Sequence, residues 1–137
     1  MPYKAKIEIR FSDIDKFGHV NNAVYLTYME QSRISYFNEI IGKNNEWEKT
    51  GIILAKAEID FLKPILFEDK IEIEVAVSRL GNKSFDMTYN IMKKQNELTI
   101  LMARGKTVLV CYDYKSNETI LIPQEWIEKV KLFENIL

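Results

Sequence analysis

The sequence predicts an α+β fold in which one long central helix is wrapped by a curved antiparallel sheet of five to six strands, followed by a short C-terminal helix. Three observations support this prediction. One long helical segment follows a single strand-like segment, four or five further strand-like segments come after it, and short turns join those strands. Short connections require neighbouring strands to run antiparallel. A helix on one face of such a sheet buries the apolar sides of both elements.

The first two elements are a strand and the long helix. Alternation of apolar and charged residues predicts a strand over Lys4 to Phe11. A helix is predicted from about Asn22 to Ile41. Asn21 or Asn22 suits its N-cap, because an asparagine side chain accepts a hydrogen bond from a first-turn amide, and Gly42 suits its end. Apolar residues cover more than one stripe of this helix, so we expect it to be largely enclosed.

The remainder of the chain alternates in the manner of strands and ends in a helix. The pattern is most regular where Ile71, Ile73, Val75 and Val77 share one face. Pro123 suits the first turn of the closing helix. The predicted elements are strands at Ile52–Lys63, Lys70–Arg79, Lys83–Lys94, Leu98–Tyr112 and Thr119–Ile122, and a helix at Gln124–Phe133.

Composition limits the class of protein. A length of 137 residues is typical of one domain, so we expect residues 1–137 to form a single domain. A net charge of -1 argues against nucleic-acid binding, and no apolar segment is long enough to span a membrane. The N-terminal segment lacks the apolar stretch of a secretory signal, so a cytoplasmic location is expected. The single cysteine, Cys111, lies in an apolar run and is interpreted as a buried hydrophobic residue.

Residues suited to chemistry are concentrated just before the long helix and at its start. Asp13 and Asp15 precede Gly18, His19 and the asparagine pair at the helix start. The first-turn amides of a helix lack intrahelical partners and direct partial positive charge outward, which suits a developing oxyanion. A carboxylate beside that terminus could attack a carbonyl, or activate water to attack it, while the amides hold the carbonyl oxygen.

Structural roles compete with this interpretation. The two aspartates could instead favour the helix dipole or cap a turn, and His19 could be a partly exposed turn residue. A metal site is not expected, because the protein has no second histidine. Glu30 and Arg33 lie three residues apart, so we interpret them as an intrahelical ion pair rather than assigning catalysis to Glu30.

The segment from Arg10 to Arg33, RFSDIDKFGHVNNAVYLTYMEQSR, resembles the hotdog-fold acyl-CoA thioesterases of the 4-hydroxybenzoyl-CoA thioesterase-like family. The family pattern is Asp-x-Asp-x-x-Gly-His-Val-Asn-Asn, followed by Tyr and by Glu-x-x-Arg within the helix. Here the pattern runs from Asp13 to Asn22, followed by Tyr25 and by Glu30 to Arg33. The resemblance covers roughly Ile7 to Pro123, and it implies a single hotdog thioesterase domain.

The resemblance also implies a catalytic arrangement. It places the general base or nucleophile on Asp15 and the main-chain donor for the thioester carbonyl near Asn22. His19 matches a histidine of related acyl-carrier-protein thioesterases, but Phe17 replaces their asparagine, so His19 is an accessory candidate. No cofactor is implied.

For the substrate and the assembly, the resemblance implies an acyl-CoA held between two subunits whose sheets join edge to edge. A homodimer or a homotetramer (a dimer of dimers) is therefore expected. An apolar acyl group would contact Phe17, Gly18 and Tyr25. The CoA phosphates would need cations at strand ends, and the candidates, with one hydroxyl, are Arg79, Lys83, Arg104 and Ser84.

Other functions remain open from the residues alone. An acyl-acyl carrier protein thioesterase is one alternative, and a hotdog protein that binds acyl-CoA without hydrolysing it is another. A dehydratase or hydratase on the same fold would show a different motif, which is not found. A scaffold role would be favoured only by an absence of acyl-CoA turnover.

Overall fold

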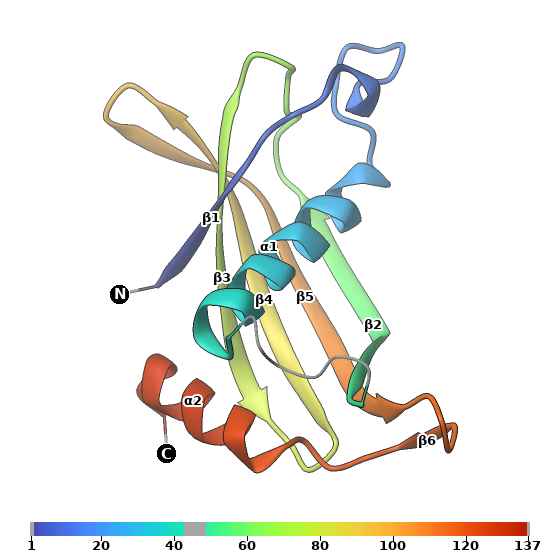
Figure 1. Ribbon diagram of the computed structural model, residues 1–137. Coiled ribbons are helices and arrows are strands. Elements are labelled where there is room, and N and C mark those ends of the chain that lie inside the picture. Colours follow the sequence, from blue (N-terminus) through green and yellow to red (C-terminus); the bar gives the residue numbers. More distant parts are fainter. Residues whose placement is uncertain (1, 43–48, 137) are drawn as a thin grey trace.

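The computed structural model describes residues 2–42 and 49–136. Met1 and Leu137, the two ends of the predicted domain, lie outside the described residues. In Figure 1 the long helix α1 lies across one face of a curved sheet, and α2 lies at the lower end of that sheet. The elements are β1 (Tyr3–Ile7), the short 3-10 helix η1 (Phe11–Asp13), α1 (Val24–Ile40), β2 (Gly51–Phe61), β3 (Lys70–Leu80), β4 (Ser84–Gln95), β5 (Leu98–Asp113), β6 (Glu118–Thr119) and α2 (Gln124–Glu134).

The six strands form one antiparallel sheet in the order β1-β3-β4-β5-β2, with β6 added to β5. β1 and β2 therefore lie at opposite ends of this order, and α1 connects them. The predicted fold class is confirmed: one long helix, a six-stranded antiparallel sheet and a short C-terminal helix. β2 leaves one of its edges unpaired within the described chain.

The core lies between α1 and the sheet. The predicted alternation of β3 is confirmed, since Ile71, Ile73, Val75 and Val77 are all buried. On β5, Gly105 makes room for a side chain of α1, because an added Cβ there would come within 2.7 Å of Met29 Cε and 2.8 Å of Met29 Sδ. The absence of a side chain at Gly105 therefore lets Met29 pack directly against the sheet.

The first strand is shorter than predicted. β1 ends at Ile7 rather than at Phe11, because the chain turns into η1. The carboxylate of Asp13 accepts the main-chain N–H of Arg10 at 2.9 Å, which closes this turn. The last strand is also short, but the N–H of Ile120 still donates to the carbonyl of Cys111 at 3.0 Å.

The helix α1 starts two residues later than predicted, at Val24. The predicted N-cap is wrong, because the cap residue is Ala23 and no side chain caps the helix. Asn21 Oδ1 instead accepts the N–H of Ala23 at 2.9 Å, in the turn that precedes the helix. At the other end, Gly42 has φ +112° and directly follows the cap residue Ile41, as predicted. No helix among residues 2–42 and 49–136 combines the length and the apolar character needed to cross a membrane.

The expectation that α1 is largely enclosed is wrong for the single chain. One face is buried against the sheet, but Leu26 and Ile34 on the other side are 41% and 52% exposed. The reason is visible in Figure 1, where α1 and β2 diverge toward the start of β2. Nothing in the described chain covers this side of the helix, so its apolar residues face outward.

Candidate active site

A tight loop carries the proposed catalytic residues. The N–H of Asp15 donates to the carbonyl of His19 at 2.9 Å, and the N–H of Gly18 donates to the carbonyl of Asp15 at 3.0 Å. An isolated bridge between Ile14 and Val20 continues this pairing. Gly18 has a backbone φ of +85°, which residues other than glycine rarely adopt. Glycine at this position therefore allows the tight turn. We call residues 15–19 the Asp15 loop.

The carboxylate of Asp15 is half-buried and only partly engaged. Its Oδ1 accepts the N–H of Phe17 at 2.9 Å. Its Oδ2 has no hydrogen-bond partner within the described chain. One oxygen thus orients the side chain, and the other is left available to a ligand or to water.

The Asp15 loop leads into a small pocket at the start of α1. The pocket has a volume of about 210 Å³ and is lined by His19, Val20, Asn22, Tyr25, Phe61, Leu62, Lys63 and Pro64. The N–H of Val20 donates to the carbonyl of Ile65 at 2.8 Å, which fixes the loop against the connection between β2 and β3. The pocket therefore lies between the start of α1 and the end of β2.

The main-chain amides at the start of α1 are less free than the sequence suggests. The N–H groups of Val24 and Tyr25 donate to the carbonyls of Asn21 and Asn22 at 2.9 and 3.3 Å, and the N–H of Ala23 donates to the Asn21 side chain. The N–H of Asn22 donates to no acceptor among residues 2–42 and 49–136. Asn22 therefore supplies a main-chain donor at the pocket that is free within the described chain.

The two aspartates of the motif have different surroundings. Asp13 is 1% exposed, and its carboxylate accepts hydrogen bonds from the Tyr28 hydroxyl at 2.6 Å and from the Arg10 guanidinium at 3.0 Å. Burial acts to raise the pKa of Asp13, but the hydrogen bonds from Tyr28 and Arg10 outweigh burial and lower it below the ordinary 3.8. Asp13 is fully engaged in holding the loop, which leaves Asp15 for chemistry.

The structure brings together some of the other predicted site residues. His19 is exposed and lines the pocket with Asn22 and Tyr25. Tyr25 is buried and its ring packs edge-on against Phe61, with 4.9 Å between ring centroids. Phe17 is 73% exposed at the tip of the loop and does not line this pocket. Gly18, beside it, is also exposed.

Three of the four residues predicted to bind CoA, Arg79, Lys83 and Ser84, lie elsewhere, whereas Arg104 pairs with Asp60 of β2, next to Phe61 of the pocket. Arg79 donates to Ser84 Oγ and to Asp86 Oδ1, both at 2.9 Å, and Lys83 is exposed in the same turn between β3 and β4. The Asp15 loop follows β1, whose last residue Ile7 pairs with Ile71 at the other end of β3. Arg79 is eight positions from Ile71, or roughly 26 Å at a rise of ~3.3 Å per residue. The two groups therefore lie at opposite ends of the sheet in one chain.

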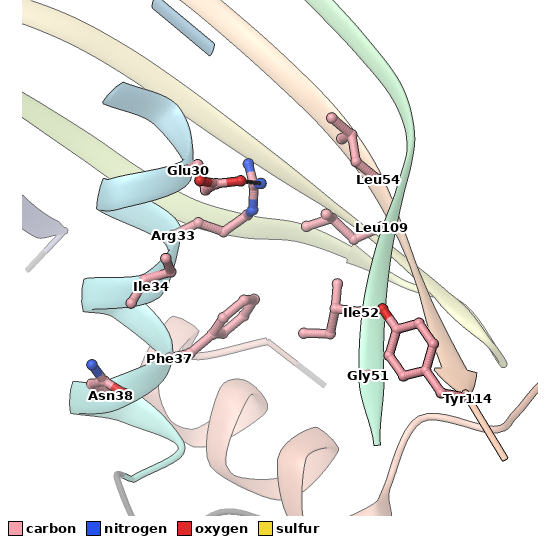
Figure 2. Close-up of a pocket in the computed structure, with 10 residues that line it drawn as sticks. All are labelled: Glu30, Arg33, Ile34, Phe37, Asn38, Gly51, Ile52, Leu54, Leu109 and Tyr114. Carbon is pink, nitrogen blue, oxygen red and sulfur yellow. Dashed lines mark ion pairs between the residues drawn. The ribbon is translucent and has the colours of Figure 1, made fainter. Parts of the chain in front are cut away.

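A second concavity, which the sequence did not predict, lies between α1 and β2. Its volume is about 570 Å³, and Figure 2 shows the side chains that line it. Arg33 lines this groove and is only 8% exposed. The predicted ion pair with Glu30 exists, but at 3.9 Å. The signal was present in the sequence, because Arg33 follows Tyr25 and Met29 at the spacing of the buried helix stripe.

Two further expectations concern a metal site and the role of Cys111. Within them, no group of three or more His, Cys, Asp or Glu side chains is arranged to hold a metal ion. Cys111 is fully buried in β5, and burial raises the pKa of its thiol to about 11. The interpretation of Cys111 as a buried hydrophobic residue is confirmed.

Solved structures share the architecture of this chain. A thioesterase from Thermus thermophilus, determined in complex with coenzyme A and Zn, is 32% identical, with a TM-score of 0.82 over 98% of this chain and 95% of that chain. A 4-hydroxybenzoyl CoA thioesterase mutant complexed with 4-hydroxybenzoyl CoA has a TM-score of 0.86 at 17% identity, over 93% and 97% of the two chains. The latter likeness shows the fold alone, which is the hotdog fold.

Curated relatives extend the comparison. YsmA of Bacillus subtilis is 33% identical over 61% of this chain and 56% of its own length. The acyl-acyl carrier protein thioesterase ATL3 of Arabidopsis thaliana is 29% identical over 82% of this chain and 60% of its own length. The chain thus spans somewhat more than half the length of these two relatives. The long-chain acyl-CoA thioesterase FadM of Escherichia coli is 22% identical over 93% of this chain and 96% of its own length.

The family model of the thioesterase-like superfamily matches residues 9–130, a span that contains the Asp15 loop, α1 and both concavities. The chain belongs to the thioesterase-like superfamily.

Proposed function

We propose that the protein hydrolyses the thioester of an acyl-CoA to the free acid and CoA, with Asp15 as the general base or nucleophile. One observation carries this proposal: a carboxylate with a free oxygen and a main-chain N–H without an acceptor lie on consecutive segments at the start of α1. Within the residues that the structure describes, Asp15 Oδ2 is a free oxygen and the N–H of Asn22 is a free donor. Membership of the superfamily supports the same reaction.

The chemistry follows from these two groups. In the general-base form, Asp15 takes a proton from water as the water oxygen bonds to the thioester carbon, and the negative charge that develops on the carbonyl oxygen is held by the Asn22 N–H. In the nucleophilic form, an Asp15 oxygen makes that bond and water later cleaves the mixed anhydride. In both forms the C–S bond breaks and the thiolate of CoA leaves. His19 lines the same pocket and is an accessory donor in this proposal.

We further propose that the chain acts as a homodimer or as a dimer of dimers. β2 has an unpaired edge, and the side of α1 next to it exposes Leu26 and Ile34. A two-fold axis that pairs two β2 edges antiparallel brings the Asp15 end of one chain beside the opposite end of the other. That arrangement moves Arg79, Lys83 and Ser84 of one copy toward the Asp15 loop of the second, where they would bind the CoA phosphates.

The acyl group in this proposal is apolar at the thioester end, because Tyr25 and Phe61 face the small pocket. Phe17 and Gly18, exposed at the loop tip, would contact the substrate at the same entrance. An acyl carrier protein is the alternative carrier, since ATL3 is named an acyl-acyl carrier protein thioesterase. The cytoplasmic location expected from the sequence stays a prediction.

The test is thiol release from a panel of thioesters. Acyl-CoAs of several chain lengths, an aromatic acyl-CoA and matched acyl carrier protein thioesters are incubated with the protein, and free thiol is followed with a chromogenic reagent. We expect catalytic release from at least one acyl-CoA, with faster turnover than from its carrier-protein counterpart. Binding of acyl-CoA without release would instead identify a non-catalytic binding protein.

A further inference from the structure

The groove between α1 and β2 contains a buried charge with few partners. The side chain of Arg33 is 10% exposed. Its Nη1 donates to the hydroxyl of Tyr89 at 3.3 Å, and that hydroxyl is 2.7 Å from Thr107 Oγ1. The Glu30 carboxylate is 3.9 Å from Nη2, beyond hydrogen-bond distance, and Glu30 is 62% exposed at the edge of the groove.

A guanidinium has five N–H donors in a planar fork. Within the described chain, only one of those of Arg33 reaches an acceptor, and that acceptor is neutral. A buried cation is stable only where hydrogen bonds and opposite charge replace its lost hydration. The remaining donors of Arg33 therefore require acceptors that the described residues do not provide.

Most of the remaining side chains of the groove are apolar, while Glu30, Asn38 and Tyr114 add polar groups. Ile34, Phe37, Ile52, Leu54 and Leu109 contribute side chains to it, as Figure 2 shows. A ligand that fills such a groove has a hydrocarbon body, and Arg33 selects a ligand that also carries an oxygen. The small pocket and the groove share the same two elements, since Tyr25 and Phe61 of the pocket also lie on α1 and β2.

We propose that this groove binds an acyl chain that bears a hydrogen-bond-accepting oxygen, a hydroxyl or carboxylate, at the end remote from the thioester, and that Arg33 recognises this oxygen. The proposal rests on the proposed function, because it assigns the substrate class of the same enzyme. Tyr89 and Thr107 act as positioning residues that hold one edge of the guanidinium.

The experiment measures binding rather than turnover. Thioethers of CoA, which cannot be hydrolysed, are prepared as S-alkyl, S-(ω-hydroxyalkyl) and S-(ω-carboxyalkyl) series from six to fourteen carbons. Dissociation constants are measured by isothermal titration calorimetry. The thioester can lie on the Asp15 loop of the same copy or of a second copy, and the distance from there to Arg33 differs between these arrangements. A series of chain lengths is therefore needed. At the length that reaches Arg33, we expect an ω-oxygen to tighten binding by ~10-fold or more, as for a hydrogen bond to a charged group.

Three variants locate the effect. Arg33→Met keeps the length of the side chain and removes the charge, and a buried charge replaced by an apolar group is commonly tolerated by the fold. We expect it to bind plain and ω-oxygenated thioethers equally. Glu39→Gln, a control at an exposed residue of α1 that does not line the groove, keeps the preference. Tyr89→Phe reduces the preference without abolishing it, because the guanidinium keeps its charge but loses its positioning contact.

Equal affinity of the wild-type protein for plain and ω-oxygenated thioethers at every length would overturn the proposal. That is the result expected if a side chain of a second copy already fills the free donors of Arg33. Persistence of the preference in Arg33→Met would overturn it as well. Binding of all thioethers together with an absence of thiol release would count against the proposed hydrolysis alone.

Discussion

The hydroxyl of Tyr28 donates a hydrogen bond of 2.6 Å to the buried carboxylate of Asp13. This contact joins the middle of α1 to the segment that precedes the Asp15 loop. The carbonyl of Asp13 in turn accepts the N–H of Asn21 at 2.9 Å. One residue therefore fixes both sides of the proposed active site, with the catalytic carboxylate on one side and the free amide on the other.

Removal of the Tyr28 hydroxyl should destabilise the protein in a pH-dependent manner. The pKa of Asp13 is lowered in the folded state, so its contribution to stability is present above the unfolded pKa of about 3.8 and is lost as the pH falls through the folded value. Tyr28→Phe weakens this effect, and we expect a loss of about 1–3 kcal/mol near neutral pH. The difference from wild type should shrink at acid pH.

Urea unfolding of both proteins at about pH 6 and about pH 3 measures this difference. Tyr112→Phe is the matched control, because the Tyr112 hydroxyl makes no hydrogen bond within the part of the chain that the structure describes. A loss of stability for Tyr28→Phe that is the same at both pH values would show that Asp13 is not the partner responsible.

Asn22 should stabilise the oxyanion through its main-chain N–H and not through its side chain. Asn22→Ala keeps the N–H, so we expect a change in kcat of no more than a few-fold. Asn22→Pro removes the N–H at a helix start, where proline is tolerated, and should lower kcat by ~10²–10³ as for other oxyanion donors. Steady-state kinetics measures kcat for the two variants, and circular dichroism checks that both are folded. Equal activity of both variants would assign the oxyanion to another group.

Mixing two inactive variants should restore activity if the site is shared between copies. Asp15→Asn removes the carboxylate, and Arg79→Ala removes the proposed phosphate contact at the other end of the sheet. A mixed dimer then has one site with both defects and one intact site. After refolding together in equal amounts, we expect roughly a quarter of wild-type activity at low acyl-CoA concentration, from random pairing in a two-fold dimer. Activity no higher than the average of the separate variants would place both residues in the same chain's site.

The buried Cys111 should stay unreactive in the folded protein. With a thiol pKa of about 11, roughly one part in a thousand is thiolate at pH 8, and no part of the residue is exposed. A chromogenic thiol reagent should therefore report no protein thiol until denaturant is added, and then one equivalent. Rapid reaction of the native protein would show that the strand β5 opens readily.

The sheet was predictable because strict alternation of apolar residues is itself the physical signature of a strand with one buried face. The positions Ile73 and Val75 illustrate this, since both were placed on one face of a strand and both are buried. The end of β1 was not predictable, because apolar residues at Ile9 and Phe11 continue the alternation while the Asp13 carboxylate turns the backbone.

The site was predictable only in part. The motif identified the Asp15 loop. The structural role of Asp13, which leaves Asp15 for chemistry, depends on a hydrogen bond from Tyr28, 15 positions away in the sequence. Arg33 was interpreted only as the partner of Glu30 in an intrahelical ion pair. Its place on the buried stripe of Tyr25 and Met29 can be read from the local spacing, but its contact with Tyr89 of β4, 56 positions away, cannot.

The strongest test of the proposed hydrolysis is the replacement of Asp15. Thiol release from the best acyl-CoA is measured for Asp15→Asn, with absence of deamidation verified by mass spectrometry and an unchanged melting temperature. Asp60→Asn is the control, because the Asp60 side chain is 72% exposed and pairs with Arg104 only at 3.9 Å. We expect kcat to fall by ~10²–10⁴ in Asp15→Asn, as for loss of an acid–base group, and to stay at the wild-type value in Asp60→Asn. Wild-type turnover by a verified Asp15→Asn protein would contradict the proposed mechanism.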